Sequence, residues 1–144
     1  MAFTGFQKVG GGKAGDAKKR VIGAVAYAVG DLLMRSTTAG TLIAATSSAT
    51  PNLFGNGGGI VVKATDGVVT EVEIDEIDYD AEYFAQTTNN SNVAHNYMLM
   101  ALTDSNTVNN TGTDDVTNPV FMQTGVVGAA ADKKIVGQFV RQIS

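Results

Sequence analysis

The segment VTEVEIDEIDYDAEYF, residues 69–84, places seven carboxylates within twelve positions and still has an apolar residue at almost every other place. Strict alternation of this kind is typical of a β-strand, because successive side chains point to opposite faces of a sheet. One face of the segment is therefore expected to be apolar and buried, and the other acidic. No other feature of the chain constrains its fold as strongly.

The alternation changes phase once, at Asp75-Glu76. The apolar side chains fall at positions 72 and 74 before this point and at 77, 79, 81 and 83 after it. A β-bulge inserts one extra residue into a strand, so we predict a bulge that keeps both halves of the segment facing the same core.

The seven carboxylates are then expected to line a solvent-exposed face, about 7 Å apart at alternate positions. This spacing is too wide for a pair of catalytic acids without a partner strand, and a calcium site needs a loop that folds around the ion. We interpret the acidic face as a solvated surface that also prevents strand-to-strand aggregation. The alternative is an acidic patch that docks on a basic partner, such as the N-terminal arm of a neighbouring copy.

Composition extends the sheet prediction to the whole chain. The 144 residues fit one domain, and frequent Gly, Asn, Thr and Ser with only two Pro favour short strands joined by polar turns. We predict a mainly β protein, a single-domain β-sandwich or barrel of about eight short strands. Strands are expected over 21–29, 32–35, 41–46, 60–65, 68–74 with its acidic continuation, 97–104, 119–128 and 135–143. Asp66-Gly67 predicts a two-residue hairpin, and a helix over 21–29 is the competitor that Gly23 and Gly30 disfavour.

The first twenty residues differ from the rest of the chain. They hold five of its ten basic residues, opposed only by Asp16, although the net charge is −4. Their glycine content disfavours a stable helix or strand. We therefore expect a flexible basic arm over 1–20, which becomes ordered on a partner protein, and a β domain over 21–144. A nucleic-acid tail is the alternative, but the arm lacks dense arginine and interleaved aromatics. The candidate contact residues of the arm are Lys8, Lys13, Lys18, Lys19 and Arg20.

The motifs that carry chemistry are incomplete, so we expect no enzyme, no cofactor and no metal centre. The chain has no cysteine, and His95 is its only histidine, too few ligands for a transition metal. No GxSxG elbow accompanies His95, and Lys13 in VGGGKAG precedes Ala rather than the Ser or Thr of a phosphate loop. Met98 and Met100 share one phase of their strand and are expected in the core.

The loop DSNTVNNTGTDD, residues 104–115, has a partial likeness to a calcium loop. Val108 stands where an oxygen ligand is needed, and Asp115 ends the twelve-residue window in place of a bidentate Glu. A looser cation site built from Asp104, Asn106, Asp114 and Asp115 stays open beside the alternative of an Asx-rich surface loop.

The order of these segments resembles the small capsid decoration (cement) proteins of tailed bacteriophages. The stretches that carry the resemblance are VAYAVGDLLMRSTTAGTLIAAT, VVTEVEIDEIDYDAEYFAQTTNNSN, NYMLMALTDSNTVNNTG and GVVGAAADKKIVGQFV, within residues 25–140. The resemblance implies a mostly β protein, commonly trimeric, that binds the outside of an assembled shell. Its partner would be the major capsid protein, and the basic arm would reach across the joint between neighbouring capsid subunits.

This resemblance places the protein on the capsid exterior of a virion, after synthesis in the host cytoplasm. No apolar stretch is long enough to span a bilayer, and the N-terminus does not have the pattern of a secretory signal, so no membrane partner is expected. The alternatives are another virion component, such as a tail-tube or head-fibre protein, and a carbohydrate-binding β-domain that uses the Asn-rich loops.

Overall fold

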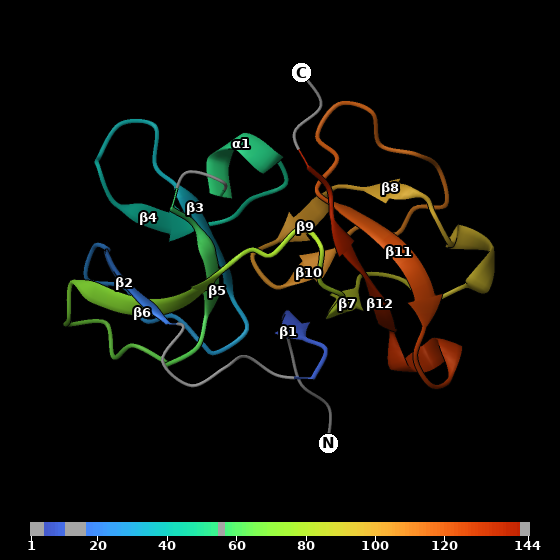
Figure 1. Ribbon diagram of the computed structural model, residues 1–144, viewed down its shortest axis with the longest axis horizontal. Coiled ribbons are helices and arrows are strands. Elements are labelled where there is room, and N and C mark those ends of the chain that lie inside the picture. Colours follow the sequence, from blue (N-terminus) through green and yellow to red (C-terminus); the bar gives the residue numbers. More distant parts are fainter. Residues whose placement is uncertain (1–4, 11–16, 55–56, 142–144) are drawn as a thin grey trace.

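The computed structural model describes residues 5–10, 17–54 and 57–141, and it confirms a mainly β protein with 37% strand and 6% helix. Twelve short strands form two sheets that lie side by side (Figure 1). In the described residues, three one-turn helices occur in the connections between strands: α1 (Pro51–Phe54), η1 (Val93–His95) and η2 (Ala130–Asp132). None of the helices in the described part of the chain could cross a membrane.

The larger sheet has seven strands and curls into a nearly closed barrel, here called the large barrel. Its curvature follows from the chain itself, because only Ala101 separates the strands at the two ends of the sheet. In sheet order the strands are β8 (Leu99–Met100), β11 (Phe121–Val126), β12 (Lys134–Phe139), β7 (Tyr83–Thr87), β10 (Thr107–Val108) and β9 (Leu102–Asp104), with β1 (Gln7–Lys8) also on β7.

The second sheet has five strands and is also strongly curled, because a parallel bridge between Ile22 and Leu42 joins its two edges. In sheet order these strands are β2 (Lys18–Val21), β6 (Glu71–Glu76), β5 (Gly59–Val61), β3 (Leu32–Arg35) and β4 (Leu42–Ala44). A sheet whose edges meet leaves few unpaired backbone groups for another chain to join.

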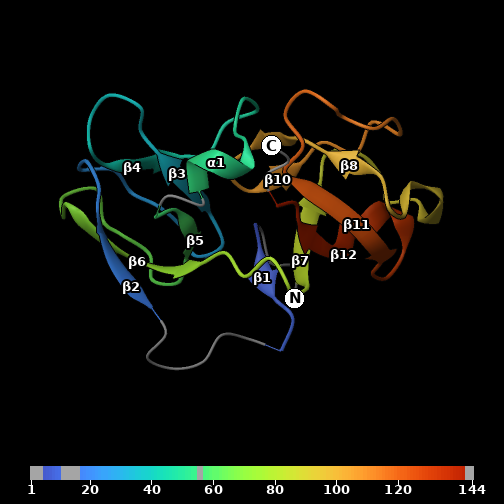
Figure 2. The same ribbon diagram turned by 45° about the horizontal axis from the view of Figure 1, so that its top comes forward.

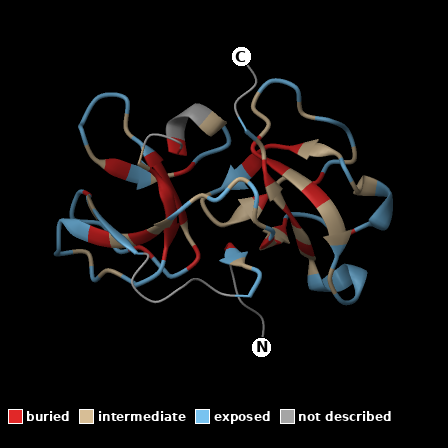
Figure 3. Cartoon of the chain, in the orientation of Figure 1, coloured by how far each residue is buried: buried red, intermediate tan, exposed pale blue. Residues whose placement is uncertain are grey.

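The two sheets share their apolar interior through β3. Leu32 and Met34 face the core of the large barrel, whereas Leu33 faces the smaller core inside the five-stranded sheet. All three side chains are buried, as the red stretch of β3 in Figure 3 shows. A strand that is apolar on both faces reads as a continuous apolar run, and this explains the sequence LLM at these positions.

Aromatic rings fill the centre of the large barrel, around Phe139. The ring of Phe139 lies 5.0–5.2 Å, centroid to centroid, from those of Tyr83, Phe6 and Phe121, and 6.1 Å from that of Phe54. Most of these pairs are steeply tilted or edge-to-face, the arrangement that aromatic quadrupoles favour. The predicted core positions Met98 and Met100 also lie in this cluster, Met100 buried and Met98 partly buried.

The acidic segment keeps its predicted alternation but not its predicted bulge. Val72 and Ile74 are buried inside the five-stranded sheet, whereas Tyr83 is buried in the large barrel. The change of phase at Asp75-Glu76 is the point where β6 ends, and residues 77–82 cross from one sheet to the other. The two halves therefore face two different cores. The prediction of one bulged strand on one core is wrong, because alternation reports which side chains are buried but not where.

Two further strand predictions are wrong. Residues 23–31 form a loop, because the backbone N–H of Tyr27 bonds to the Thr65 hydroxyl rather than to a neighbouring strand. β5 and β6 do pair as an antiparallel hairpin, but residues 62–70 connect them instead of a two-residue turn. Within this loop the Asp66 carboxylate accepts the N–H groups of Val68 and Val69.

The boundary at residue 20 between a loose arm and the β domain is also wrong for the described residues. Phe6 is only 2% exposed and packs in the aromatic cluster, while Lys8 lies in β1 and Lys18–Val21 form β2. Gly5 makes the entry of Phe6 possible: its φ is +86°, and a Cβ there would collide with the backbone of Gly30. Figure 2 shows β1 between the two halves of the molecule, next to β7.

Candidate functional site

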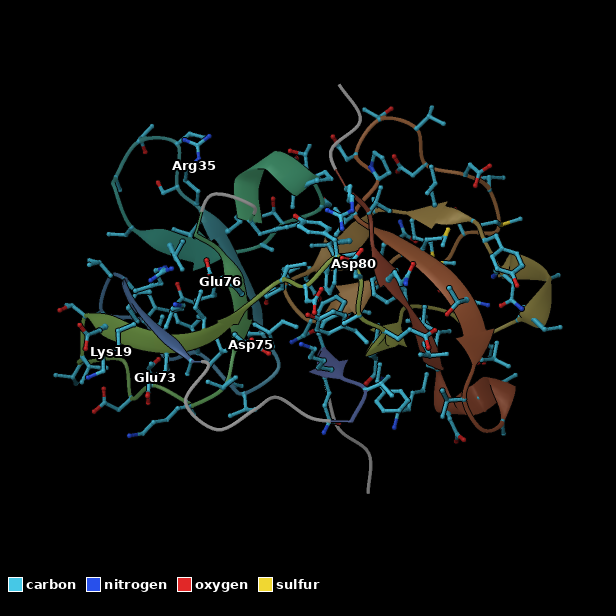
Figure 4. All side chains as sticks on the ribbon, viewed as in Figure 1. Lys19, Arg35, Glu73, Asp75, Glu76 and Asp80 are labelled. Atoms are coloured by element: carbon cyan, nitrogen blue, oxygen red, sulfur yellow. The ribbon has the colours of Figure 1, made fainter. Side chains whose placement is uncertain are left out.

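The basic residues near the N-terminus and the acidic segment 71–82 lie against each other. β2 pairs antiparallel with β6, so Lys19 stands opposite Glu73 and Arg20 opposite Val72. β1 pairs with β7 and brings Lys8 to the connection between β6 and β7. Figure 4 shows Lys19 and Glu73 in this region, on the half of the molecule that the five-stranded sheet forms.

Among the described residues, five ion pairs hold carboxylates of this segment. They are Lys8–Asp78 (3.4 Å), Lys19–Glu71 (3.9 Å), Arg20–Glu76 (3.3 Å), Lys63–Glu73 (3.9 Å) and Arg141–Asp80 (2.6 Å). Glu82 accepts a 2.7 Å hydrogen bond from the Thr124 hydroxyl, and Asp75 also has an interaction. The acidic face is thus neutralised largely within the chain. The alternative interpretation is that the acidic face binds the basic arm of a neighbouring copy. This interpretation loses support, because the same chain supplies the cations that pair with the acidic face.

These ion pairs contribute little free energy individually. Their side chains are 28–83% exposed, and exposed pairs are worth roughly 0–1 kcal/mol each. Arg20 is the most fixed of the cations, since its guanidinium also donates to the carbonyl oxygens of Gly57 (3.2 Å) and Lys19 (3.0 Å). The pairs therefore set charge balance and strand position more than stability.

The five predicted contact residues of the arm divide into three groups. Lys8, Lys19 and Arg20 pair with carboxylates of the same chain. Lys18 is exposed and makes no ion pair with any residue that the structure describes. Lys13 lies outside the described residues. The structure therefore does not bring the four described side chains together as one free basic surface.

Asp78 and Tyr83 mark the point where the acidic segment enters the large barrel. The backbone N–H of Asp80 donates to the Asp78 carboxylate and lowers the pKa of this carboxyl below its usual range. Lys8 lowers the pKa further, whereas burial opposes the shift. The backbone N–H of Asp78 donates to the Tyr83 hydroxyl at 2.9 Å. Burial raises the pKa of Tyr83 to about 12, so this phenol stays protonated at neutral pH and does not serve as a base.

The candidate cation loop is built from Asx turns. Asp104 accepts the N–H of Asn106, Asp115 accepts those of Thr117 and Asn118, and Asp114 accepts the N–H of Leu99. No group of three or more His, Asp or Glu side chains suited to a metal ion occurs in residues 5–10, 17–54 and 57–141. These carboxylates order the loop, as the surface-loop alternative expects.

His95 lies in η1, beside a buried glutamine that the sequence did not single out. Gln123 is fully buried, and its Nε2 donates to the Asn92 carbonyl and the Asn96 side chain, both at 2.9 Å, which fixes the two ends of η1. Gln123 Oε1 and His95 Nδ1 are buried without a hydrogen-bond partner among the described residues. The half-buried His95 ring packs against Gly112.

Two exposed features also emerged only from the structure. Four valines (Val25, Val62, Val68 and Val69), here called the valine surface, are 43–76% exposed on the two loops 23–31 and 62–70. These loops are joined through Thr65, which bonds to the backbone of Val25 and Tyr27. Elsewhere, the Arg35 side chain makes no ion pair or hydrogen bond with another described residue. No sequence signal separates these side chains from other valines and arginines.

Comparison with known protein families, with curated proteins and with solved structures found no match to this chain.

Proposed function

We propose that this chain is a structural virion protein that binds the outer surface of an assembled phage capsid and stabilises it by bridging neighbouring capsid subunits. The capsid assignment comes from the resemblance of the quoted stretches to decoration proteins. The partner is then the major capsid protein, and the protein acts as a trimer on the capsid exterior. Several weak contacts on one trimer would multiply a modest affinity by ~10²–10⁴.

The valine surface is the observation that carries a binding role. Exposed apolar side chains gathered on neighbouring loops suit a contact with another protein, and Val68 alone is 76% exposed. Lys19, Lys63, Glu71 and Glu73 line a hollow together with Val69, so charged side chains lie beside this part of the valine surface. An apolar centre with a polar rim is the usual anatomy of a protein interface.

The contact surface must differ from the predicted loose arm. Because Phe6 is a core residue and β2 is part of a sheet, the described residues before 21 are built into the fold. We therefore assign the capsid contact to the valine surface. Lys18 also belongs to this contact, because it makes no ion pair with any described residue.

The test is co-sedimentation of the purified full-length chain with undecorated capsid particles. We expect saturable binding, and we expect Val68→Asp to weaken it by about tenfold or more, because the interface would have to bury an unpaired charge. Val116→Asp is the matched control, since Val116 is 82% exposed on a loop of the large barrel and should bind normally. Absence of binding by the unmodified chain would end the proposal. Equal binding by both variants would remove the valine surface from it.

A carbohydrate-binding role is the second candidate, and Tyr97 is the observation that favours it. This side chain is 71% exposed, its backbone has a left-handed φ of 72°, and Asn96 precedes it. A bulky residue in that conformation is costly and marks functional sites, and sugar sites commonly present an exposed aromatic face. A glycan array should then give signals that Tyr97→Ala abolishes, and silence of the unmodified chain would exclude this candidate.

A further inference from the structure

A hollow beside the hairpin between β3 and β4 has a different character from the rest of the surface. Two arginines, Arg20 and Arg35, line it together with four hydroxyl side chains from residues 36–41. No carboxylate lines the hollow, although acidic residues outnumber basic ones by 14 to 10 in the chain. Figure 4 shows Arg35 on this hairpin, while the labelled carboxylates, of which Glu76 lies nearest to Arg35 in this view, belong to the acidic segment.

The two arginines differ in how far their charge is already used. Arg20 is held by the Glu76 carboxylate at 3.3 Å and by the Gly57 carbonyl at 3.2 Å, so its charge is balanced. The Arg35 side chain is exposed and has no ion-pair or hydrogen-bond partner among the described residues. The hollow therefore has a net charge of about one positive unit, supplied by Arg35.

The hairpin around Arg35 is ordered before any ligand arrives. The Ser36 hydroxyl oxygen accepts the N–H groups of Thr38 (3.3 Å) and Ala39 (3.1 Å), and the Ser36 N–H donates to the Thr41 carbonyl at 2.9 Å. This turn leaves the Ser36 O–H available to donate to a ligand. Val21, 59% exposed, and Leu42 give the hollow an apolar side.

The geometry points to a carboxylate-binding site in this hollow. Its ligand is the side-chain carboxylate of an acidic segment on a protein partner, bound by the Arg35 guanidinium and the Ser36 hydroxyl. The methylene groups of the ligand lie against Val21. A carboxylate matches the single free charge, whereas a phosphate dianion would be only half neutralised and a nucleic acid would be repelled by the net charge of −4. The inference does not rest on the proposed function, since any partner with an exposed acidic side chain would satisfy it.

The experiment is a titration of the isotope-labelled full-length chain with sodium acetate, followed by amide NMR shifts at constant ionic strength and near-neutral pH. Sodium chloride and inorganic phosphate serve as comparison anions. We expect saturable shifts at the amides of residues 36–41, with a Kd on the order of 10 mM for one charge-assisted contact. Arg35→Gln should weaken the binding by about tenfold or more. The matched control Arg141→Gln removes an exposed arginine that pairs with Asp80 and should leave the acetate shifts unchanged.

Three results would overturn the inference. One is the absence of saturable shifts in the hairpin with acetate. Another is equal acetate binding by the unmodified chain and by Arg35→Gln. The third is much tighter binding of phosphate than of acetate, which would assign the hollow to a different anion. Failure of co-sedimentation with capsids would leave all three outcomes unaffected, so the two proposals fail separately.

Discussion

Truncation of Phe6 tests whether the N-terminal residues are part of the fold. The side chain is 2% exposed, and its ring centroid lies 5.2 Å from that of Phe139 and 5.9 Å from that of Phe121. Loss of a buried Phe side chain costs about 3–5 kcal/mol, a large part of the roughly 5–15 kcal/mol that stabilises a typical protein. With a urea dependence of about 2 kcal/mol per M, the unfolding midpoint of Phe6→Ala should fall by about 1.5–2.5 M.

Phe84→Ala is the matched control for this measurement. Phe84 lies on β7, only partly buried, with the Lys134 ammonium 4.8 Å from its ring. Its truncation should cost about 1–2 kcal/mol, from partial burial and a cation–π contact. Both midpoints are read from urea unfolding followed by circular dichroism. If Phe6→Ala is no less stable than Phe84→Ala, residues 5–10 are not packed into the fold and the assignment of Phe6 to the core is wrong.

Three further predictions concern charge and backbone conformation. The folded chain holds the Tyr83 proton more tightly than the unfolded chain, because the pKa is raised to about 12; stability should therefore fall by roughly 2–3 kcal/mol between about pH 10 and 12. Urea unfolding across that range should show the fall, and Tyr83→Phe should show a smaller one, because the pKa values of Tyr27 and Tyr79 are also raised by burial. Gly5→Ala should lower the thermal midpoint more than Gly10→Ala, since both have positive φ (86° and 82°) but only Gly5 meets other backbone; equal midpoints would contradict the close approach. A double-mutant cycle of Arg20→Gln and Glu76→Gln should give a coupling of about 0.2–1 kcal/mol that salt weakens, and a salt-independent coupling would contradict an exposed pair.

Alternation predicted much of the fold because it depends on local geometry. Positions 72, 74 and 83 are buried and 77, 79 and 81 partly buried, as the period-two pattern of the acidic segment indicates. The strands expected over 32–35, 119–128 and 135–143 correspond to β3, β11 and β12. Alternation does not give the identity of the core that a side chain enters, so the phase change predicts a bulge where the chain in fact crosses from one sheet to the other.

The N-terminal residues escaped prediction for a different reason. The sequence KKRV of β2 has neither alternation nor apolar character, and it becomes a strand because β6, 50 to 56 residues further along the chain, offers it hydrogen bonds and opposite charges. Glycine around Phe6 suggested flexibility, but Gly5 serves a close approach to Gly30. The unpaired Arg35 could not be predicted either, because the absence of a partner is a property of the tertiary structure.

The position of Phe139 at the centre of the aromatic cluster has a consequence for biosynthesis. Phe139 follows Phe6 by 133 residues in the sequence, yet the two rings lie 5.2 Å apart, centroid to centroid. The chain grows at roughly 5–20 residues per second and emerges N-terminus first, so the large barrel has no central ring until residue 139 has left the ribosome. The earlier strands therefore expose their apolar faces until Phe139 emerges, and a chain truncated before residue 139 cannot close this interior.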